Sequence, residues 1–396
     1  MRNFRPLFVA RDPVPSLPRT DAADGAPGAA PTGAAPPADP TGVPAASDPA
    51  GVGASDPAGV PAFSGRARSA PDSVSVADFG RAAVLRYTLT RRSDRLRRLL
   101  AERGTALLHA HFGVEGVYAA PVARALGVPL VTTLHGFDVT VTKSRLLASR
   151  KPSWVNYVAW RGELFDTGAS FVCVSEHIRR KALDWGYPAD RLVVLPTGVD
   201  VDLIPPADPV ETPRILHIAR LVEKKGTADL LRAFAVVRRA VPGAELVIVG
   251  DGPLREPLDG LARELDVSAA VRFLGARTHT ETLDWLRRSR LLCQPSVTAA
   301  SGDQEGLPTV LLEAAATGRP VVGTTHGGIA EAVTDGENGF LVAERDVAAL
   351  ADRLTVLLRD PQLCQRFGEA GRQTVVERYN LRRQTEKLES LYRSLR

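Results

Sequence analysis

The chain has 396 residues, which is enough for two domains of ordinary size, and 44% of them are hydrophobic. Its 50 lysines and arginines nearly balance 45 aspartates and glutamates, so the formal charge of +5 gives no reason to expect a nucleic-acid partner. The three cysteines lie far apart without a CxxC pair, which argues against a disulfide scaffold or structural zinc and favours a cytoplasmic compartment.

The first part of the chain lacks membrane signals and then becomes low in complexity. The opening MRNFRPLFVARDPVP has too short an apolar stretch for a signal peptide, and no run approaches the roughly 18 apolar residues that cross a bilayer. Residues 13–73 are rich in Pro, Ala, Gly, Asp and Ser and repeat SDPAGV at 47–52 and 55–60. Such a segment buries too little apolar surface to offset its ordering entropy, so we predict disorder there.

From residue 75, short apolar strands alternate with helical patterns, which predicts a parallel, doubly wound α/β sheet. The predicted helices are 76–103, 115–126, 144–166 and 176–185, and the predicted strands are 106–112, 129–136, 171–175 and 192–196. The first helix is basic and carries Arg91, Arg92, Arg95, Arg97 and Arg98. Such a run is usually a solvated helix face, and docking on anionic lipid is the alternative.

A second α/β series follows a Pro-rich, acidic stretch, residues 204–213, which we interpret as a linker. Its predicted strands are 214–219, 245–250, 271–275, 291–296, 320–324 and 339–342, and its predicted helices are 226–240, 254–265, 280–290 and 308–318. We therefore expect one domain at 74–203 and another at 214–361. Two such sheets leave a cleft at the carboxyl ends of their strands, where folds of this type bind ligands.

Several common nucleotide and metal motifs are absent. No GxxxxGK[ST] or HExxH occurs, and Gly250-Asp251-Gly252-Pro253 lacks the third glycine of a dinucleotide fingerprint, so a tight turn is the better interpretation. We expect no cofactor and no bound metal.

Two carboxylates, Glu305 and Glu313, lie eight residues apart in EGLPTVLLE. Glu305 is predicted to lie in a loop and Glu313 in the helix that begins at Pro308, a residue suited to the first helical position. Carboxylates can hold sugar hydroxyls, and a helix start can receive a phosphate. An ordinary acidic residue before a helix is the equally plausible structural interpretation.

Two cations follow the first strand of the second domain. Arg220 ends the strand in HIAR, and Lys225 precedes the next helix. Fixed cations at that edge can neutralise a diphosphate, although a solvated basic loop explains them too. Lys224 is interpreted as a surface residue.

Histidines end two successive strands of the first domain, at HAHFG (residues 109–113) and HGFD (residues 135–138). The following glycines would let a ligand approach the backbone, which favours a site over satisfied core histidines. His109 and His111 should share one face of their strand. A metal site remains a minor alternative, because the sequence shows no third ligand.

Taken in order, seven motifs resemble the group 1 retaining glycosyltransferases, particularly the bacterial exopolysaccharide and lipopolysaccharide branch. The motifs are HAHFG, HGFD, VSEHIRRKAL, LPTGVD, ARLVEKKG, VGDGP and EGLPTVLLEAAATGRPVVGT. The resemblance covers residue 96 to the end of the chain and implies the GT-B fold, in which two Rossmann-like domains face a cleft. Ala219 departs from the family's usual glycine.

The resemblance implies a role for each matching residue. Arg220 and Lys225 would bind the diphosphate, Glu305 the sugar hydroxyls and Glu313 the ribose. His135 would face the donor sugar near the reacting carbon. The remaining implied contacts are Gly306, Leu307, Pro308 and Thr309 on the donor side, and His111, Gly113 and Asp138 on the acceptor side.

The resemblance is weakest at the start of the chain. Residues 1–12 look like a remnant strand, and the family's first strand and its loop have no counterpart before it, so we expect the N-terminal domain to lack them. The helical stretch 362–396, with Phe367, Tyr379 and Tyr392 as packing residues, resembles helices that cross back to the first domain.

The expected activity is metal-independent hexosyl transfer, with retention, from a UDP- or GDP-sugar to a glycan or lipid-linked acceptor in cell-surface polysaccharide synthesis. The protein would be cytoplasmic and peripheral on the inner face of the membrane. The alternatives are an inactive sugar-nucleotide-binding subunit, because of the missing strand, and a sucrose- or trehalose-synthase-like transferase with a small acceptor.

Overall fold

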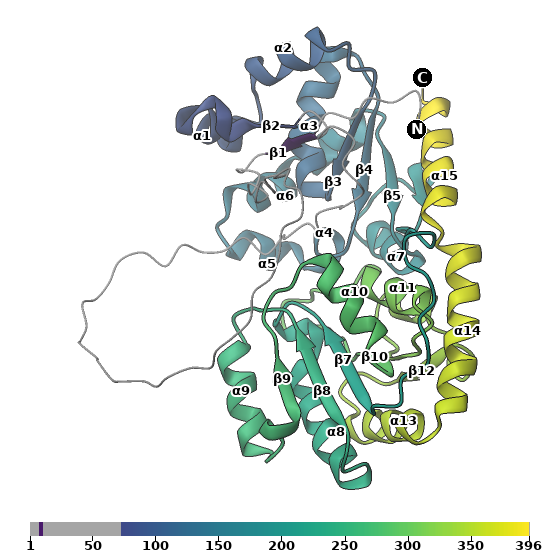
Figure 1. Ribbon diagram of the computed structural model, residues 1–396. Coiled ribbons are helices and arrows are strands. Elements are labelled where there is room, and N and C mark those ends of the chain that lie inside the picture. The colour runs from purple at the N-terminus through teal and green to yellow at the C-terminus, as the bar shows by residue number, and fades with distance from the viewer. Residues whose placement is uncertain (1–7, 11–72, 396) are drawn as a thin grey trace, which may run out of the picture. The chain divides into compact units, whose positions relative to one another are not determined.

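The computed structural model describes residues 8–10 and 73–395 and divides the chain into two units, 1–80 and 81–396 (Figure 1). In the first unit, β1 (Phe8–Ala10) pairs in parallel with β2 (Ser73–Ser75), and the 3-10 helix η1 (Val76–Phe79) follows. The segment predicted to be disordered lies outside the described residues up to residue 72, and Ser73 already belongs to β2.

The second unit begins with a four-stranded parallel sheet in the order β3-β4-β5-β6. Its strands are β3 (Leu108–His111), β4 (Leu130–Leu134), β5 (Ser170–Cys173) and β6 (Leu192–Val194). The accompanying helices are α1 (Arg81–Thr90), α2 (Asp94–Glu102), α3 (Gly113–Leu126), α4 (Phe137–Thr140), α5 (Lys143–Ala148), α6 (Pro152–Asp166), α7 (Glu176–Asp184) and the 3-10 helix η2 (Ala189–Arg191).

Two of the long predicted helices are broken. The stretch 76–103 turns at Arg91, whose backbone φ is 58°, and α2 restarts where the Ser93 side chain accepts the Leu96 N–H. The stretch 144–166 is interrupted before Pro152, which starts α6 and disfavours a helical residue ahead of it. Arg91 is also buried: its guanidinium pairs with Glu163 at 2.7 Å and donates to the Val117 carbonyl. It is therefore no part of an exposed basic face.

A six-stranded parallel sheet follows, in the order β12-β11-β10-β7-β8-β9. Its strands are β7 (Arg214–Ile218), β8 (Glu245–Val249), β9 (Val271–Phe273), β10 (Leu291–Gln294), β11 (Val321–Thr324) and β12 (Gly339–Val342). The intervening helices are η3 (Glu223–Lys225), α8 (Thr227–Ala240), α9 (Arg255–Glu264), η4 (Ser268–Ala270), α10 (His279–Arg287), α11 (Thr309–Ala316), α12 (Ile329–Ala332) and α13 (Val347–Arg359). The predicted fold class, two parallel-sheet α/β halves, is confirmed.

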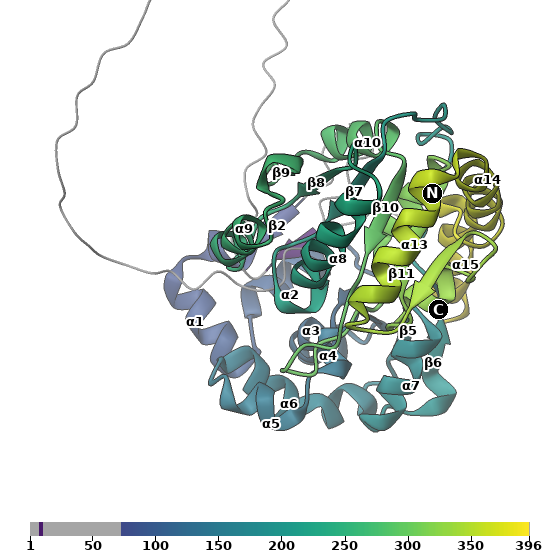
Figure 2. The ribbon, with the colours of Figure 1, turned by 90° about the horizontal axis from the view of Figure 1, so that it is seen from below.

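The buried core of the second sheet depends on a helix that we did not predict. In Figure 2, α13 lies beside α8, and the leucines of α13 are buried against that helix and the strands. They recur at helical spacing, as Leu350, Leu354, Leu357 and Leu358, so periodicity alone could have revealed α13.

The strand order determines where a site can form. The chain runs from β7 outward through β8 to β9 and then returns to place β10 on the other side of β7. The loops after β7 and β10 therefore leave the sheet at a topological switch point, where α/β folds bind ligands. The first loop carries Lys225 and the second carries Glu305.

Two C-terminal helices, α14 (Pro361–Arg378) and α15 (Leu381–Ser394), replace the single predicted stretch 362–396 and run past both sheets (Figure 1). The break between them is held by Val199, whose N–H donates to the Tyr379 carbonyl and whose carbonyl accepts from Leu381. In α14, Phe367 packs edge-on against Phe340 of the second core. In α15, Tyr392 packs on a small cluster of the first sheet.

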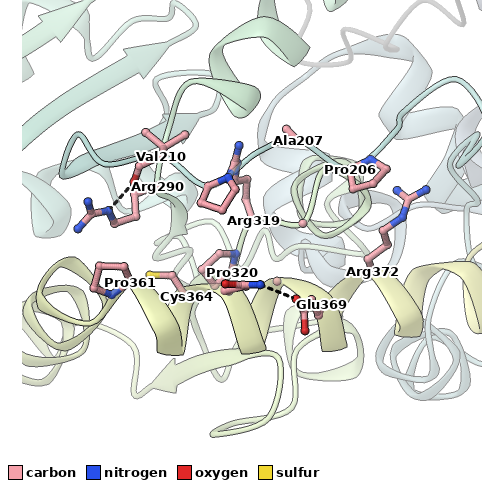
Figure 3. Close-up of a pocket in the computed structure, with 14 residues that line it drawn as sticks. Pro206, Ala207, Val210, Arg290, Arg319, Pro320, Pro361, Cys364, Glu369 and Arg372 are labelled. Atoms are coloured by element: carbon pink, nitrogen blue, oxygen red, sulfur yellow. Dashed lines mark hydrogen bonds between the residues drawn. The ribbon is translucent and has the colours of Figure 1, made fainter.

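Three arginines hold the connection between the two sheets (Figure 3). The guanidinium of Arg290 donates to the Val210 carbonyl, that of Arg319 to Asp208, and that of Arg372 to Ile204 and Val201. They line a hollow of about 180 Å³, which contains none of the predicted site residues. Because each arginine donates to backbone carbonyls, we assign this hollow to the support of the linker.

Candidate active site

The centre of the site is an ion pair at the carboxyl edge of the second sheet. Lys225 Nζ lies 2.7 Å from Glu305 Oε1, and both side chains are largely buried, with 16% and 7% of their surface exposed. Ser296 Oγ donates to the same carboxylate oxygen at 3.4 Å. The predicted diphosphate ligand and the predicted sugar ligand are thus direct neighbours. Arg220 lies exposed just beyond β7.

This corner is strongly charged. Burial would raise the pKa of Glu305, but the charges of Lys225 and Lys224 outweigh burial and hold that pKa below its ordinary value. Lys224 is not the surface residue that we expected, because its ammonium lies 3.0 Å from Asp303 and only 20% of its side chain is exposed. The site therefore has two half-buried lysines facing two carboxylates.

The main chain of Glu305 is held by a residue that the sequence did not single out. The Glu305 N–H donates to His326 Nε2 at 3.1 Å, and His326 Nδ1 lies 2.6 Å from Glu344 Oε1. His326 and the two glycines after it follow β11, so they repeat the signal that identified His135 and Gly136: a histidine and glycine at the end of a strand.

Glu313 lies in α11, which begins at Thr309, one residue later than predicted, so Pro308 is the N-cap of the helix and not its first residue. His279 Nε2 donates to the Glu313 carboxylate at 2.9 Å, and this hydrogen bond raises the pKa of His279. Leu307 and Pro308 are buried beside the helix start. Glu313 is therefore paired with the first residue of α10, and 15% of its side chain is exposed.

On the first sheet, three histidines stack in a row. As predicted, His109 and His111 share one strand face, with ring centroids 4.7 Å apart. His111 Nδ1 lies 3.0 Å from His135 Nε2, which joins the ends of β3 and β4. His109 contacts Thr133 and the Tyr392 hydroxyl, so α15 is tied to this row.

These histidines are neutral. Burial lowers the pKa of both His109 and His135 to about 3, and the repulsion between two protonated imidazoles of the row would add to this effect. Burial lowers the pKa of His111 as well. Neutral imidazoles can hydrogen-bond to hydroxyl groups through their one N–H and one lone pair, but they lack the acidic second proton that an imidazolium could give to a leaving group. Within residues 8–10 and 73–395, no group of three His, Cys, Asp or Glu side chains could hold a metal ion.

Asp138 has a different position from the one its motif suggested. It is fully buried, and its two carboxylate oxygens accept the Gly113 and Gly136 N–H groups, each at 2.9 Å. Burial raises its pKa, and these backbone hydrogen bonds oppose the rise. We therefore reassign Asp138 from acceptor contact to holding the two glycine turns in place. Gly113 is equally buried, against the Tyr157 and Tyr187 rings.

The loop from Gln304 to Gly306 brings the two halves together. A side chain at Gly306 would place its Cβ 1.9 Å from the His135 carbonyl oxygen, so the two backbones touch. Ser175 Oγ donates to the Gly306 carbonyl at 3.0 Å, and His177 Nε2 lies 2.8 Å from Gln304 Oε1. The structure thus places the backbone of His135 beside the Glu305 loop.

Sequence comparisons match almost all of the chain after its first 59 residues. Residues 205–374 match the family described as Glycosyl transferases group 1, and residues 60–203 match Glycosyltransferase Family 4. WcaL of Escherichia coli K12, whose name refers to colanic acid biosynthesis, is 34% identical over 252 residues. That alignment covers 62% of this chain and 59% of WcaL.

A second relative and a solved structure extend the match. The GDP-mannose-dependent alpha-(1-6)-phosphatidylinositol monomannoside mannosyltransferase of Mycobacterium tuberculosis H37Rv is 32% identical over 302 residues, covering 72% of this chain and 75% of its own. Anabaena HepE, solved in complex with UDP-glucose, has a TM-score of 0.66 at 20% identity, covering 82% of this chain and 86% of HepE. At that identity the likeness to HepE shows the fold.

Among the described residues, no helix is long and apolar enough to span a bilayer.

Proposed function

Since this chain belongs to the group 1 glycosyltransferases, we propose that it transfers a hexose from a UDP- or GDP-sugar to a glycan or lipid-linked saccharide, with retention at the anomeric carbon. The observation that carries the proposal is the buried Lys225–Glu305 pair, 2.7 Å apart, at the switch point of the second sheet. One partner matches the charge of a diphosphate, and the other matches the hydroxyls of a sugar.

In the proposed reaction, the bond between the anomeric carbon and the diphosphate oxygen breaks as an acceptor hydroxyl bonds to the same face. Negative charge then grows on the diphosphate. The Lys225 ammonium, the Arg220 guanidinium and the N–H groups at the start of α11 stabilise that charge. One such group is worth about 3–4 kcal/mol in comparable sites, or ~100–1000-fold in rate.

Neutral histidines decide where the acceptor's proton goes. With pKa values of about 3, His109 and His135 are too weakly basic to take up the proton of the acceptor hydroxyl. We therefore propose that the proton passes from the acceptor hydroxyl to the departing phosphate oxygen. His135 positions the sugar by hydrogen bonding, and Glu305 holds its hydroxyls.

We propose that transfer needs no divalent metal. Lys225, Arg220 and the α11 start supply the positive charge that a metal ion supplies in metal-dependent transferases. The test is nucleotide release in excess EDTA. Undiminished release supports the assignment, whereas release that EDTA abolishes and Mg²⁺ restores would contradict it and return attention to His109 and His111.

The donor and acceptor classes rest on the relatives. HepE was solved with UDP-glucose and the mycobacterial relative is named for GDP-mannose, so both kinds of nucleotide belong in a screen. The names of WcaL and of the Erwinia amylovora amylovoran glycosyltransferase AmsK support surface polysaccharide synthesis. UDP or GDP release that depends on added acceptor would support a transferase. Binding without release would instead assign the chain to a sugar-nucleotide-binding subunit.

We further propose that the protein docks on anionic lipid through α1, α5 and α6. Leu85 and Leu89 of α1 are 61% and 58% exposed, Leu147 of α5 is 44% exposed, and Trp160 of α6 is 49% exposed. The helix α6 packs against both α1 and α5. Residues 139–162 contain five lysines and arginines and no acidic residue. Exposed apolar side chains on helices that also carry cations suit an anionic membrane surface.

A further inference from the structure

The position of the Glu305 carboxylate depends on how the main chain of its loop is held. Among the hydrogen bonds of the described residues, the Glu305 N–H donates to one acceptor, the side chain of His326, and to no backbone carbonyl. The ring is 2% exposed and follows β11, 21 residues further along the chain. A shift of this backbone by about 1 Å would move the carboxylate away from bound sugar, and a displacement of that size can cost ~100-fold in rate.

The hydrogen bonds of His326 allow only one neutral tautomer. The Glu305 N–H can only donate, so Nε2 must carry a lone pair and the ring proton must lie on Nδ1. Nδ1 then donates to Glu344 Oε1 at 2.6 Å. A proton on Nε2 would point at the Glu305 N–H and break the contact. The tautomer is therefore tied to the position of Glu305.

Glu344 is fixed in turn. The Thr298 N–H donates to Oε2 of Glu344 at 2.7 Å, and the Thr298 hydroxyl lies 3.2 Å from Oε1. Burial would raise the pKa of Glu344, but the hydrogen bonds from Thr298 and His326 outweigh burial and lower it. An ionised carboxylate is a strong acceptor, so it favours the Nδ1–H form of the ring.

The two glycines after His326 keep the ring against the loop. A side chain at Gly327 would place its Cβ 2.3 Å from the Glu305 carbonyl oxygen, and one at Gly328 would come within 1.9 Å of the Gly306 carbonyl. Backbone therefore lies directly on backbone along residues 305–306 and 327–328. The loop has no room to move toward the ring.

We propose that His326, oriented by Glu344, is the positioning residue that sets the Glu305 carboxylate for the donor sugar. This inference rests on the proposed function, because it takes Glu305 as the sugar ligand. It implies that His326 and Glu344 affect how the sugar portion of the donor is bound. Binding of the nucleoside portion, which is assigned to Glu313 and α11, should be unaffected.

The first test needs no substrate. In protein labelled with ¹⁵N-histidine, long-range ¹H–¹⁵N correlation distinguishes the two neutral tautomers, and the His326→Gln variant identifies the signal. We expect a single Nδ1–H form in the wild type. An Nε2–H form, or exchange between the two forms, would overturn the proposal whether or not the protein is a transferase.

The second test separates the sugar from the nucleotide. For the donor found active in a screen of UDP- and GDP-hexoses, His326→Ala and Glu344→Ala should each lower kcat/KM about 10–100-fold, as loss of an orienting partner typically does. The affinity for free UDP or GDP should stay within about 2-fold, because the nucleoside ligands are not held by His326. If kcat/KM for the donor and the affinity for the free nucleotide fell by equal factors, the whole site would have been disturbed, and the proposal would be overturned.

A conservative variant completes the test. Glutamine can both accept the Glu305 N–H and donate to Glu344, so His326→Gln should recover at least half of the kcat/KM lost in His326→Ala on a logarithmic scale. The melting temperatures of both variants are measured alongside. Recovery of stability without recovery of donor use would mean that the ring serves the fold alone.

Discussion

The two edges of the site differ in charge. On the second sheet, Lys224 and Lys225 face Asp303 and Glu305 at 3.0 Å and 2.7 Å. On the first sheet, three stacked histidines are neutral because burial holds their pKa values below the ordinary range. Both edges lie at the carboxyl ends of parallel strands, so the fold places them but does not decide their chemistry.

This difference indicates a division of labour. A diphosphate that gains charge as it departs needs fixed cations, and Lys224 and Lys225 place two of them on the second sheet. A sugar and an acceptor hydroxyl need hydrogen bonds without strong charge, which neutral imidazoles provide. Removal of a charged side chain should therefore reduce activity most on the second sheet. Lowering the pH should reduce stability most through the histidines of the first sheet.

Loss of the Lys225 ammonium should have the largest effect. In Lys225→Ala, donor turnover should fall about 100–1000-fold and donor affinity should fall with it, because the charge that the ammonium meets grows in the transition state. Steady-state kinetics in EDTA would measure both. Lys224→Ala is the matched control, since its ammonium pairs with Asp303, and it should lose far less activity. Equal losses in the two variants would remove Lys225 from its assigned role.

Neutralising Glu305 should come next. Glu305→Gln keeps the size of the side chain but replaces charged hydrogen bonds to the sugar, each worth about 1.5–3 kcal/mol, so turnover should fall about 10–100-fold. The free energy of unfolding is measured in parallel, because Lys225 loses its partner. Asp303→Asn, two residues earlier in the same loop, is the control. Wild-type turnover by Glu305→Gln at both low and saturating donor would exclude Glu305 from the site.

Removing the Glu313 carboxylate should act mainly on binding. Glu313→Ala should raise KM for the donor about 10-fold with a smaller change in kcat, because ribose contacts are similar in the ground and transition states. Calorimetric titration with free UDP or GDP should show the same loss. An unchanged affinity for the nucleotide would assign the Glu313–His279 pair to the fold.

The low pKa values of the stacked histidines predict how the free energy of unfolding depends on pH. His109 has a folded pKa of about 3 against 6.5 in the unfolded chain, so only the unfolded state takes up a proton between those values. Stability should therefore fall as the pH drops below about 6.5, by up to ~1.4 kcal/mol per pH unit for each such histidine. Urea unfolding between about pH 7 and about pH 5 would measure this slope. His109→Gln should flatten it, and an identical slope in the variant would contradict the assignment.

The smallest effect concerns the lipid face. Replacing Leu85 and Leu89 together by serine should weaken co-sedimentation with anionic vesicles several-fold, since each buried leucine contributes roughly 1.5–3 kcal/mol at full burial and less at an interface. Leu203→Ser is the matched control, because that leucine is 57% exposed and lies outside α1, α5 and α6. Wild-type binding that is absent, or insensitive to salt, would refute docking on anionic lipid.

Alternation of buried strands and helices was sufficient to predict both sheets from the sequence. Every strand of the two larger sheets lies within a predicted one, except that β5 begins at Ser170, one residue before its predicted strand. Runs such as LVTTL are buried throughout, and in ELVIV the four apolar residues are buried. Helix interruptions were harder. The turn at Arg91 depends on contacts with Glu163 and Val117, which lie far along the chain, so no local pattern marks it.

The site shows the same limit. Spacing correctly predicted that His109 and His111 share a face. It could not show that Lys224 is paired, because Asp303 lies 79 residues away. Nor could it show that Asp138 is buried beneath two glycine turns, or that His326 meets Glu305. Motifs identified residue types at strand ends, whereas partners across the sheet required the structure.

The most direct test compares the affinity for a sugar nucleotide with that for the same nucleotide without its sugar. Calorimetry in EDTA, across UDP- and GDP-hexoses, gives this ratio for the wild type and for Glu305→Gln. The wild type should bind at least one sugar nucleotide more tightly than the corresponding free UDP or GDP. Glu305→Gln should reduce the ratio of the two affinities to about one, because the charged hydrogen bonds to the sugar are lost. Failure of the wild type to bind any of them, or an unchanged ratio in the variant, would contradict a donor site at the charged edge.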